Sequence, residues 1–145
     1  MLLLIAVVVS ANARAADARI KKVLPQFIDL QGRSSLSPSL YERDAYQIVL
    51  RNNLEQRSGM QFKVQWKGAS KENNLRLRIQ LRGVRGDNVR VETLEMPVKN
   101  SGMVSDWTTL TLSDESYQSF GELAAWRATL WDNGKQIAEQ KSFLW

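Results

Sequence analysis

The sequence predicts a mainly β fold, an antiparallel β-sandwich of about seven strands with one short helix. Three features of the 145-residue chain support this prediction. Several short segments alternate apolar and polar residues, which is the pattern of a strand with one face in the core and the other in water. Turn-forming residues separate these segments at intervals of about 10 to 15 residues. Only one segment shows helical spacing instead.

The first third of the chain is expected to hold one strand and the helix. Residues 23–30 alternate loosely, and Pro25 suggests an edge strand or a bulge. Ser39 begins a capping-box pattern, after which apolar residues recur at helical spacing, namely Leu40, Tyr41, Ala45, Ile48 and Val49. We therefore expect an amphipathic helix over residues 40–51. A short strand over residues 46–50 is the alternative.

From residue 60 onward the alternation becomes regular. In the first two segments, apolar residues alternate with Gln, Lys or Arg. The later segments are less regular, and Gly, Asn or Pro residues separate them. The strands expected here are residues 60–67, 75–82, 89–96 and 107–112. The polar segment 113–121 is interpreted as a passage between two sheets.

The chain is expected to finish with a β-hairpin formed by residues 124–131 and 136–145. Asn133-Gly134 lies between these strands and supplies the positive φ angles of a tight turn. A three-residue loop would place Arg127 opposite Glu139, and we prefer this register because it pairs opposite charges. A two-residue loop at Asn133-Gly134 is the alternative.

This succession of strands resembles the immunoglobulin and fibronectin type III domains. The resemblance is one of architecture, extends over most of residues 16–145, and includes the final hairpin, which is similar to the last two strands of such domains. It implies two antiparallel sheets packed face to face. The chain differs from antibody domains in having no cysteine pair.

The N-terminal segment predicts export. Residues 2–9 are an apolar run that is too short to span a bilayer, and small residues follow it. We expect residues 1–15 to be a signal peptide, cleaved near Ala13–Ala15, and residues 16–145 to form a single domain that is periplasmic or secreted, in a bacterium. A buried N-terminal strand is the alternative. Without Cys, the mature domain has neither a disulfide nor a Cys-linked lipid anchor.

The composition excludes several chemistries. The chain contains no His and no Cys, so it cannot carry a Ser-His-Asp or Cys-His site, nor a metal site built on imidazole or thiolate. We therefore expect no metal, no cofactor and no catalytic residue. The formal net charge is +5, but no aromatic stripe is interleaved with the basic residues. Nucleic acid is therefore not an expected partner.

A basic stripe on two predicted strands is the first candidate binding surface. Its side chains all fall on the polar faces of those strands, and they are Lys63, Lys67, Arg76, Arg78 and Arg82. If the two strands are neighbours, the five cations share one sheet face that could hold a polyanion such as an acidic glycan. The competing interpretation is an ordinary solvated face.

The five tryptophans are the second candidate. Trp66, Trp107 and Trp126 fit inward positions in the predicted strands. Trp131 falls on the face opposite Trp126, and Trp145 ends the sequence, so these two could stack on a sugar ring or contact a protein. Alternatively, the predicted helix could cover that sheet face, with these rings as its apolar seat.

These features predict an exported, non-enzymatic binding module with a protein or glycan partner in the cell envelope. One alternative is a small outer-membrane β-barrel. Another is a carboxylate-dependent glycan hydrolase, whose candidates would be Asp44, Glu92, Glu95, Asp114 and Glu115. The sequence selects no pair among these carboxylates and contains no insertion that would form a cleft. We therefore expect a domain without a pocket.

Overall fold

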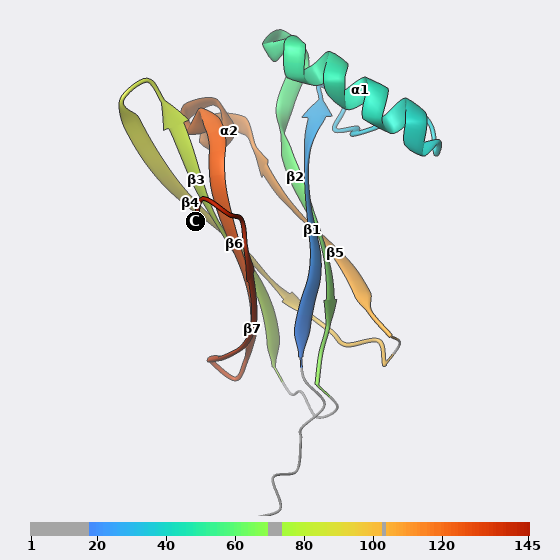
Figure 1. Ribbon diagram of the computed structural model, residues 1–145, viewed down its shortest axis with the longest axis vertical. Helices are drawn as coiled ribbons and strands as arrows, with labels where there is room; N and C mark the ends of the chain where they lie inside the picture. Colours follow the sequence, from blue (N-terminus) through green and yellow to red (C-terminus); the bar gives the residue numbers. More distant parts are fainter. Residues whose placement is uncertain (1–17, 70–73, 103) are drawn as a thin grey trace, which may run out of the picture.

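A computed structural model describes residues 18–69, 74–102 and 104–145 (Figure 1). The predicted signal peptide lies outside these residues. Within them, the chain forms seven strands, two α-helices and one short 3₁₀ helix. The strands are β1 (Arg19–Asp29), β2 (Arg57–Lys67), β3 (Leu75–Arg85), β4 (Asn88–Val98), β5 (Asp106–Ser113), β6 (Glu122–Asp132) and β7 (Lys135–Lys141). The helices are α1 (Leu40–Asn52), η1 (Leu54–Gln56) and α2 (Asp114–Phe120).

The strands form two antiparallel sheets that face each other, which confirms the predicted immunoglobulin-like sandwich (Figure 1). The first sheet has the order β1-β2-β5, and the second has the order β4-β3-β6-β7. The fourth strand therefore pairs with β3 in the second sheet. In constant-type immunoglobulin domains the fourth strand belongs instead to the first sheet.

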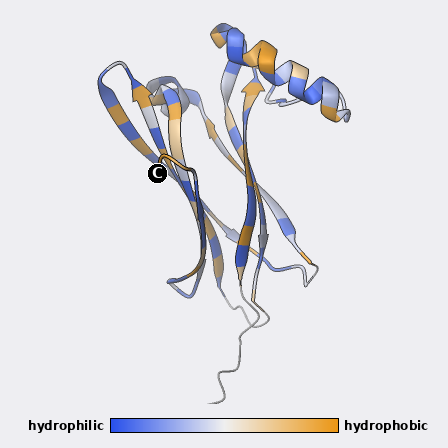
Figure 2. Cartoon of the chain, viewed as in Figure 1, coloured by the Kyte–Doolittle hydropathy of each residue, from blue (hydrophilic) through white to orange (hydrophobic). Residues whose placement is uncertain are grey.

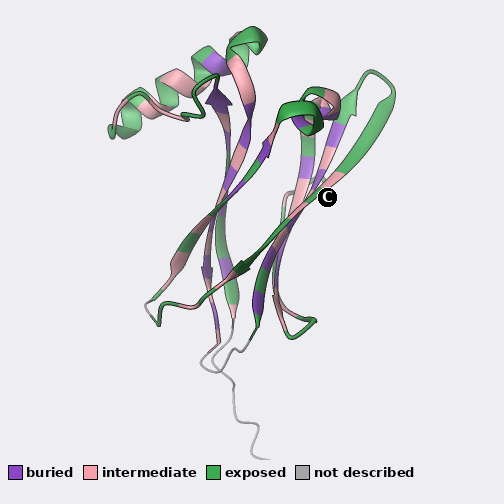
Figure 3. Ribbon diagram, turned by 180° about the vertical axis from the view of Figure 1, so that it is seen from behind, coloured by how far each residue is buried: buried purple, intermediate pink, exposed green. Residues whose placement is uncertain are grey.

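The core forms because β2 and β3 present alternate residues to the space between the sheets. Phe62 and Val64 on β2 meet Leu77 and Ile79 on β3 in one cluster of buried side chains. Figure 2 shows the alternation of apolar and polar residues along both strands. Figure 3 shows that buried segments lie along the strands, whereas α1 and the β3–β4 turn are mostly exposed. The apolar core therefore lies between the two sheets.

The final hairpin has a different register from the predicted one. Asn133 and Gly134 both have positive φ angles, and Asp132 pairs with Lys135 across a two-residue loop. A bulge next to the turn then shifts the pairing by one residue, so Arg127 lies opposite Lys141 and not opposite Glu139. The guanidinium of Arg127 still reaches the Glu139 carboxylate diagonally, at 2.7 Å.

The passage between the sheets contains a second helix, which the sequence analysis missed. Helix α2 follows β5 of the first sheet and leads into β6 of the second, as expected for a passage between sheets. Its Phe120 is fully buried against Gly83 of β3, where an added Cβ would lie 2.3 Å from the Phe120 carbonyl oxygen. Gly83 therefore permits α2 to pack directly on the second sheet.

Helix α1 matches its predicted bounds to within one residue, and the alternative of a strand over residues 46–50 is wrong. Ser39 caps its N-terminus by accepting a hydrogen bond from the backbone N–H of Glu42. Across residues 18–69, 74–102 and 104–145, neither α1 nor any other helix has the length and apolarity to cross a bilayer.

Two tryptophans on the first sheet provide a test of this core. Trp66 is 1% exposed and donates its indole N–H to Thr108, whereas Trp107 is 53% exposed. We expect Trp66→Ala to lower the free energy of unfolding by about 3–5 kcal/mol because it leaves a cavity. Trp107→Ala should lower it by less than about 1 kcal/mol. Urea unfolding followed by circular dichroism measures both, and similar losses in the two variants would contradict this core.

Candidate functional site

Helix α1 is attached to the sandwich through polar side chains. The Gln47 amide oxygen accepts a hydrogen bond from the backbone N–H of Phe27 at 2.8 Å. The same amide donates to the backbone oxygens of Phe27 and Ser34, at 2.9 and 2.8 Å. Because β1 is an edge strand, Phe27 has backbone groups free on that side. Gln47 therefore takes the place of a further strand at this position.

A buried carboxylate forms the second attachment of α1. Asp29 ends β1, and its side chain accepts hydrogen bonds from the Tyr46 hydroxyl at 2.6 Å and from the Arg33 guanidinium at 2.9 Å. The backbone N–H groups of Gln31 and Arg33 donate to the other oxygen. Burial by itself raises the pKa of Asp29, but these hydrogen bonds outweigh it and lower the pKa from 3.8 to about 2.

These contacts turn the apolar face of α1 toward solvent. Of the α1 side chains, only Leu50 is buried. Tyr41 is 84% exposed and Ile48 is 55% exposed, and Val49 on the same side and Leu40 at the start of the helix are exposed as well. Figure 1 shows α1 extending outward from the end of the first sheet. The hypothesis that this helix covers a sheet face with its apolar side is therefore wrong.

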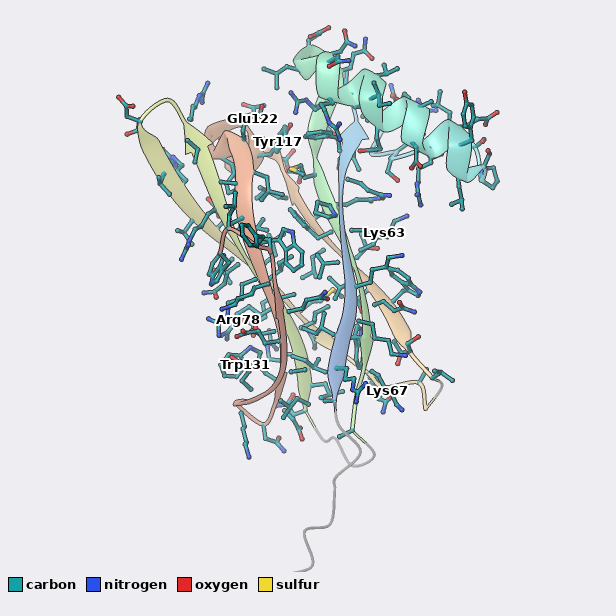
Figure 4. The ribbon with its side chains drawn as sticks, viewed as in Figure 1. Lys63, Lys67, Arg78, Tyr117, Glu122 and Trp131 are labelled. Carbon is teal, nitrogen blue, oxygen red and sulfur yellow. The ribbon has the colours of Figure 1, made fainter. Side chains whose placement is uncertain are left out.

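The five cations of the predicted basic stripe do not share one face. Lys63 and Lys67 lie on β2 in the first sheet, whereas Arg76, Arg78 and Arg82 lie on β3 in the second sheet. Figure 4 shows Lys63 and Lys67 on one side of the sandwich and Arg78 on the other. Consecutive strands were assumed to be neighbours, but the chain crosses between the sheets after β2. The stripe is therefore split in two.

On the outer face of the second sheet, the arginines are engaged within the protein. Arg76 and Arg78 both form ion pairs with Glu95 of β4, the latter at 2.9 Å. Hydrogen bonds from these two arginines lower the pKa of Glu95. The Arg78 guanidinium also stacks on Trp131, 4.5 Å from the ring centroid. Figure 4 shows these two side chains next to each other.

The C-terminal tryptophan joins the same surface. The backbone N–H of Ser142 donates to the carbonyl oxygen of Trp126, which holds the end of the chain against β6. Trp145 then lies under the Arg82 guanidinium, 4.0 Å from the ring centroid. Trp131 and Trp145 are thus partly buried by arginines of this sheet, and neither ring is fully presented to solvent.

The exposed tryptophan of the sandwich lies on the other sheet. Trp107 was expected to point inward, which is wrong, because Leu110 and Leu112 of β5 point inward and Trp107 has the opposite parity. Its ring lines a shallow depression with Lys63 and Arg43. The alternation of β5 itself contained the signal that would have found this residue.

A pocket of about 660 Å³ opens at the end of the sandwich near η1 and α2. Both sheets contribute walls: β2 with η1 on one side, and β3, α2 and the start of β6 on the other. The lining residues are Leu30, Leu54, Glu55, Arg57, Val84, Arg85, Gly86, Tyr117, Gln118, Gly121 and Glu122. The expectation of a domain without a pocket is therefore wrong. Four separate segments of the sequence form it, and no single insertion marks it.

Arg57 supplies a buried positive charge to this pocket. Its side chain is only 5% exposed, and the guanidinium lies over the Phe27 ring at 4.4 Å. The carboxylate of Glu122 is 4.0 Å away, and Arg57 Nε has no hydrogen-bond partner within residues 18–69, 74–102 and 104–145. Burial is the main reason why the pKa of Tyr117 is raised. The positive charge of Arg57 and its hydrogen bond to Tyr117 act in the opposite direction and lower this pKa. An unpaired buried donor costs about 1–3 kcal/mol.

The carboxylates considered for hydrolysis lie on three different elements. Asp44 is on α1, Glu92 and Glu95 are on β4, and Asp114 and Glu115 are on α2. Asp44 and Glu95 form ion pairs with arginines. In the part of the chain that the structure describes, no three Asp or Glu side chains gather closely enough to hold a metal ion. The pocket instead contains Glu55 and Glu122, two residues that the sequence analysis did not select.

Comparisons with known proteins show the fold. A crystal structure from Akkermansia muciniphila resembles this chain with a TM-score of 0.53 and 12% sequence identity. The similarity covers 87% of this chain and 70% of the other. No family model and no curated protein matches the sequence.

The attachment of α1 predicts a pH dependence of stability. Because the pKa of Asp29 is depressed in the folded state, its contribution is present above about pH 4 and lost as the pH falls through about 2. Asp29→Asn should therefore destabilise the protein by about 2 kcal/mol at pH 7, and the difference from wild type should shrink in acid. Urea unfolding at a series of pH values measures this difference.

The matched control is Asp87→Asn, which changes an exposed carboxylate in the β3–β4 turn. Its stability should remain within about 0.5 kcal/mol of wild type at pH 7. An Asp29→Asn variant that differs from wild type by a constant amount between pH 7 and pH 2 would contradict the role given to this carboxylate.

Proposed function

We propose that this protein is an exported, non-enzymatic binding domain that holds a protein partner on the exposed apolar face of α1. The observation that supports the proposal is the orientation of this helix. Tyr41, Ile48 and Val49 lie within about one third of the helix circumference and are exposed, and Leu40 at the start of the helix is exposed as well. Contiguous exposed apolar side chains of this kind mark interaction surfaces.

The charges of α1 favour a protein partner over a membrane surface. Helices that lie on membranes carry an excess of Lys and Arg on their polar side, which attracts anionic lipids. Here Arg43 and Arg51 are balanced by Glu42 and Asp44, so the helix has no net charge. An amphipathic helix without this excess suits a hydrophobic groove on another protein.

The absence of catalysis and the export of the chain belong to the same proposal. The sequence contains neither His nor Cys. Glu55 and Glu122 line the pocket, yet both are exposed, whereas a carboxylate that acts as a general acid near neutral pH needs a shielded environment. The apolar run at residues 2–9, followed by Ala13–Ala15, supports cleavage of a signal peptide and a location in the periplasm or outside the cell.

A substitution in the middle of the exposed face tests the proposal. Ile48→Asp places a charge where the partner would bury an aliphatic side chain, and it should reduce retention of the partner by about tenfold or more. The measurement uses immobilised wild-type and variant protein with one envelope extract, and retained proteins are quantified by mass spectrometry. The fold of Ile48→Asp is checked by circular dichroism.

The matched control is Val104→Asp, which changes an exposed apolar residue in the loop before β5. It should retain the same proteins as wild type. If Ile48→Asp and Val104→Asp retain the same proteins in the same amounts, α1 is not the binding surface.

A further inference from the structure

We propose that the pocket around Arg57 binds a ligand that joins a carboxylate to a short apolar chain. This site is separate from the exposed face of α1, and either one can exist without the other. Three observations lead to it: a buried cation that is incompletely neutralised, apolar walls next to it, and a volume of about 660 Å³. Pockets of about 300–1,000 Å³ are typical of small-molecule sites.

The charge of Arg57 is only weakly compensated by the carboxylates of the described residues. Asp29 lies opposite Arg57 in the β1–β2 register, but its oxygens accept hydrogen bonds from Gln31, Arg33 and Tyr46. The Glu122 carboxylate is 4.0 Å away and its side chain is 76% exposed, so water screens most of this attraction. A guanidinium has five N–H donors that match the geometry of a carboxylate.

Apolar side chains line the same pocket. Leu30, Leu54 and Val84 are exposed there, and Tyr117 contributes a buried ring. A hydrated inorganic anion would leave these surfaces without a contact. An anion with a hydrocarbon chain would pair with Arg57 and also remove apolar surface of its own and of the walls from water.

Charge changes at two residues of the pocket mouth should change the affinity for a carboxylate in opposite directions. Figure 4 shows Tyr117 and Glu122 at the end of the sandwich where the pocket opens. Glu122 competes with an incoming carboxylate for Arg57, so neutralising Glu122 should strengthen binding. A new carboxylate at Leu54, which lies on η1 on the opposite wall, should weaken it.

Hexanoate and hexanamide are the probes that test the site, because they differ only in the charge of the head group. Binding to the complete protein is followed by NMR titration. We expect hexanoate to shift resonances of the pocket residues and to bind about tenfold or more tightly than hexanamide. Acetate should bind more weakly than hexanoate because it lacks the chain.

Variants assign the binding to Arg57. Arg57→Gln should lower the hexanoate affinity by about tenfold or more, whereas the exposed control Arg51→Gln on α1 should not change it. If Arg57→Gln fails to fold, Glu122→Gln and Leu54→Glu carry the test, since both change exposed residues. Glu122→Gln should raise the affinity about threefold and Leu54→Glu should lower it by a similar factor, with Glu115→Gln on α2 as the neutral control.

The outcomes separate this site from its alternatives. Equal binding of hexanoate and hexanamide, or no effect of Glu122→Gln and Leu54→Glu, overturns the proposal. A blocked peptide, acetyl-Leu-Glu-Leu-amide, identifies the source of the carboxylate. If it competes with hexanoate, the natural ligand is an acidic peptide segment, and if it does not, the ligand is a small amphiphilic acid. None of these results depends on the retention measured with Ile48→Asp.

Discussion

The position of α1 depends on the polar contacts that Asp29 and Gln47 make at the end of β1. Asp29 is a buried carboxylate that accepts four hydrogen bonds, one of them from Tyr46 of the helix. Hydrogen bonds to a buried charge contribute about 1.5–3 kcal/mol each, which is as much as burying one aliphatic side chain. Turning the apolar face of α1 inward would break these contacts. The fold therefore leaves that face available.

The hydrogen bonds of Asp29 also affect the charge balance of the pocket, because they keep this carboxylate from pairing with Arg57. Asp29 is the acidic residue opposite Arg57 in the register, and it would be the natural counter-ion if its oxygens were free. Because they hold the turn at Arg33 and the helix at Tyr46, Arg57 is left with the Phe27 ring, a hydrogen bond to Tyr117 and a 4.0 Å ion pair with the exposed Glu122. Asp29 thus anchors α1 and does not pair with Arg57. As a result, Arg57 has an Nε–H donor beside the pocket that is unpaired in the described part of the chain.

Patterns of neighbouring residues in the sequence correctly predicted the buried faces of two strands and the start of one helix. The alternation along residues 60–67 and 75–82 identified the buried side chains of β2 and β3, and the cap at Ser39 identified the start of α1. The error at Trp107 was local, because the alternation of β5 already placed it outward, but the other failures are non-local. The basic stripe required β2 and β3 to be neighbours, the hairpin register depends on a bulge, and the pocket combines four distant segments. Neither composition nor spacing carries this information, because sheet membership is set by the packing of the whole sandwich.

The contrast between the two arginine groups shows why an inventory of charges does not locate a binding site. Arg78 is paired with Glu95 and stacked on Trp131, so a ligand there would have to replace contacts that the fold already makes. Its net gain would be small. Arg57 has already lost its hydration by burial and has gained only partial compensation, so an incoming carboxylate would add contacts without displacing comparable ones. The same reasoning applies to the exposed face of α1, where binding would remove apolar surface from water without breaking a contact of the fold.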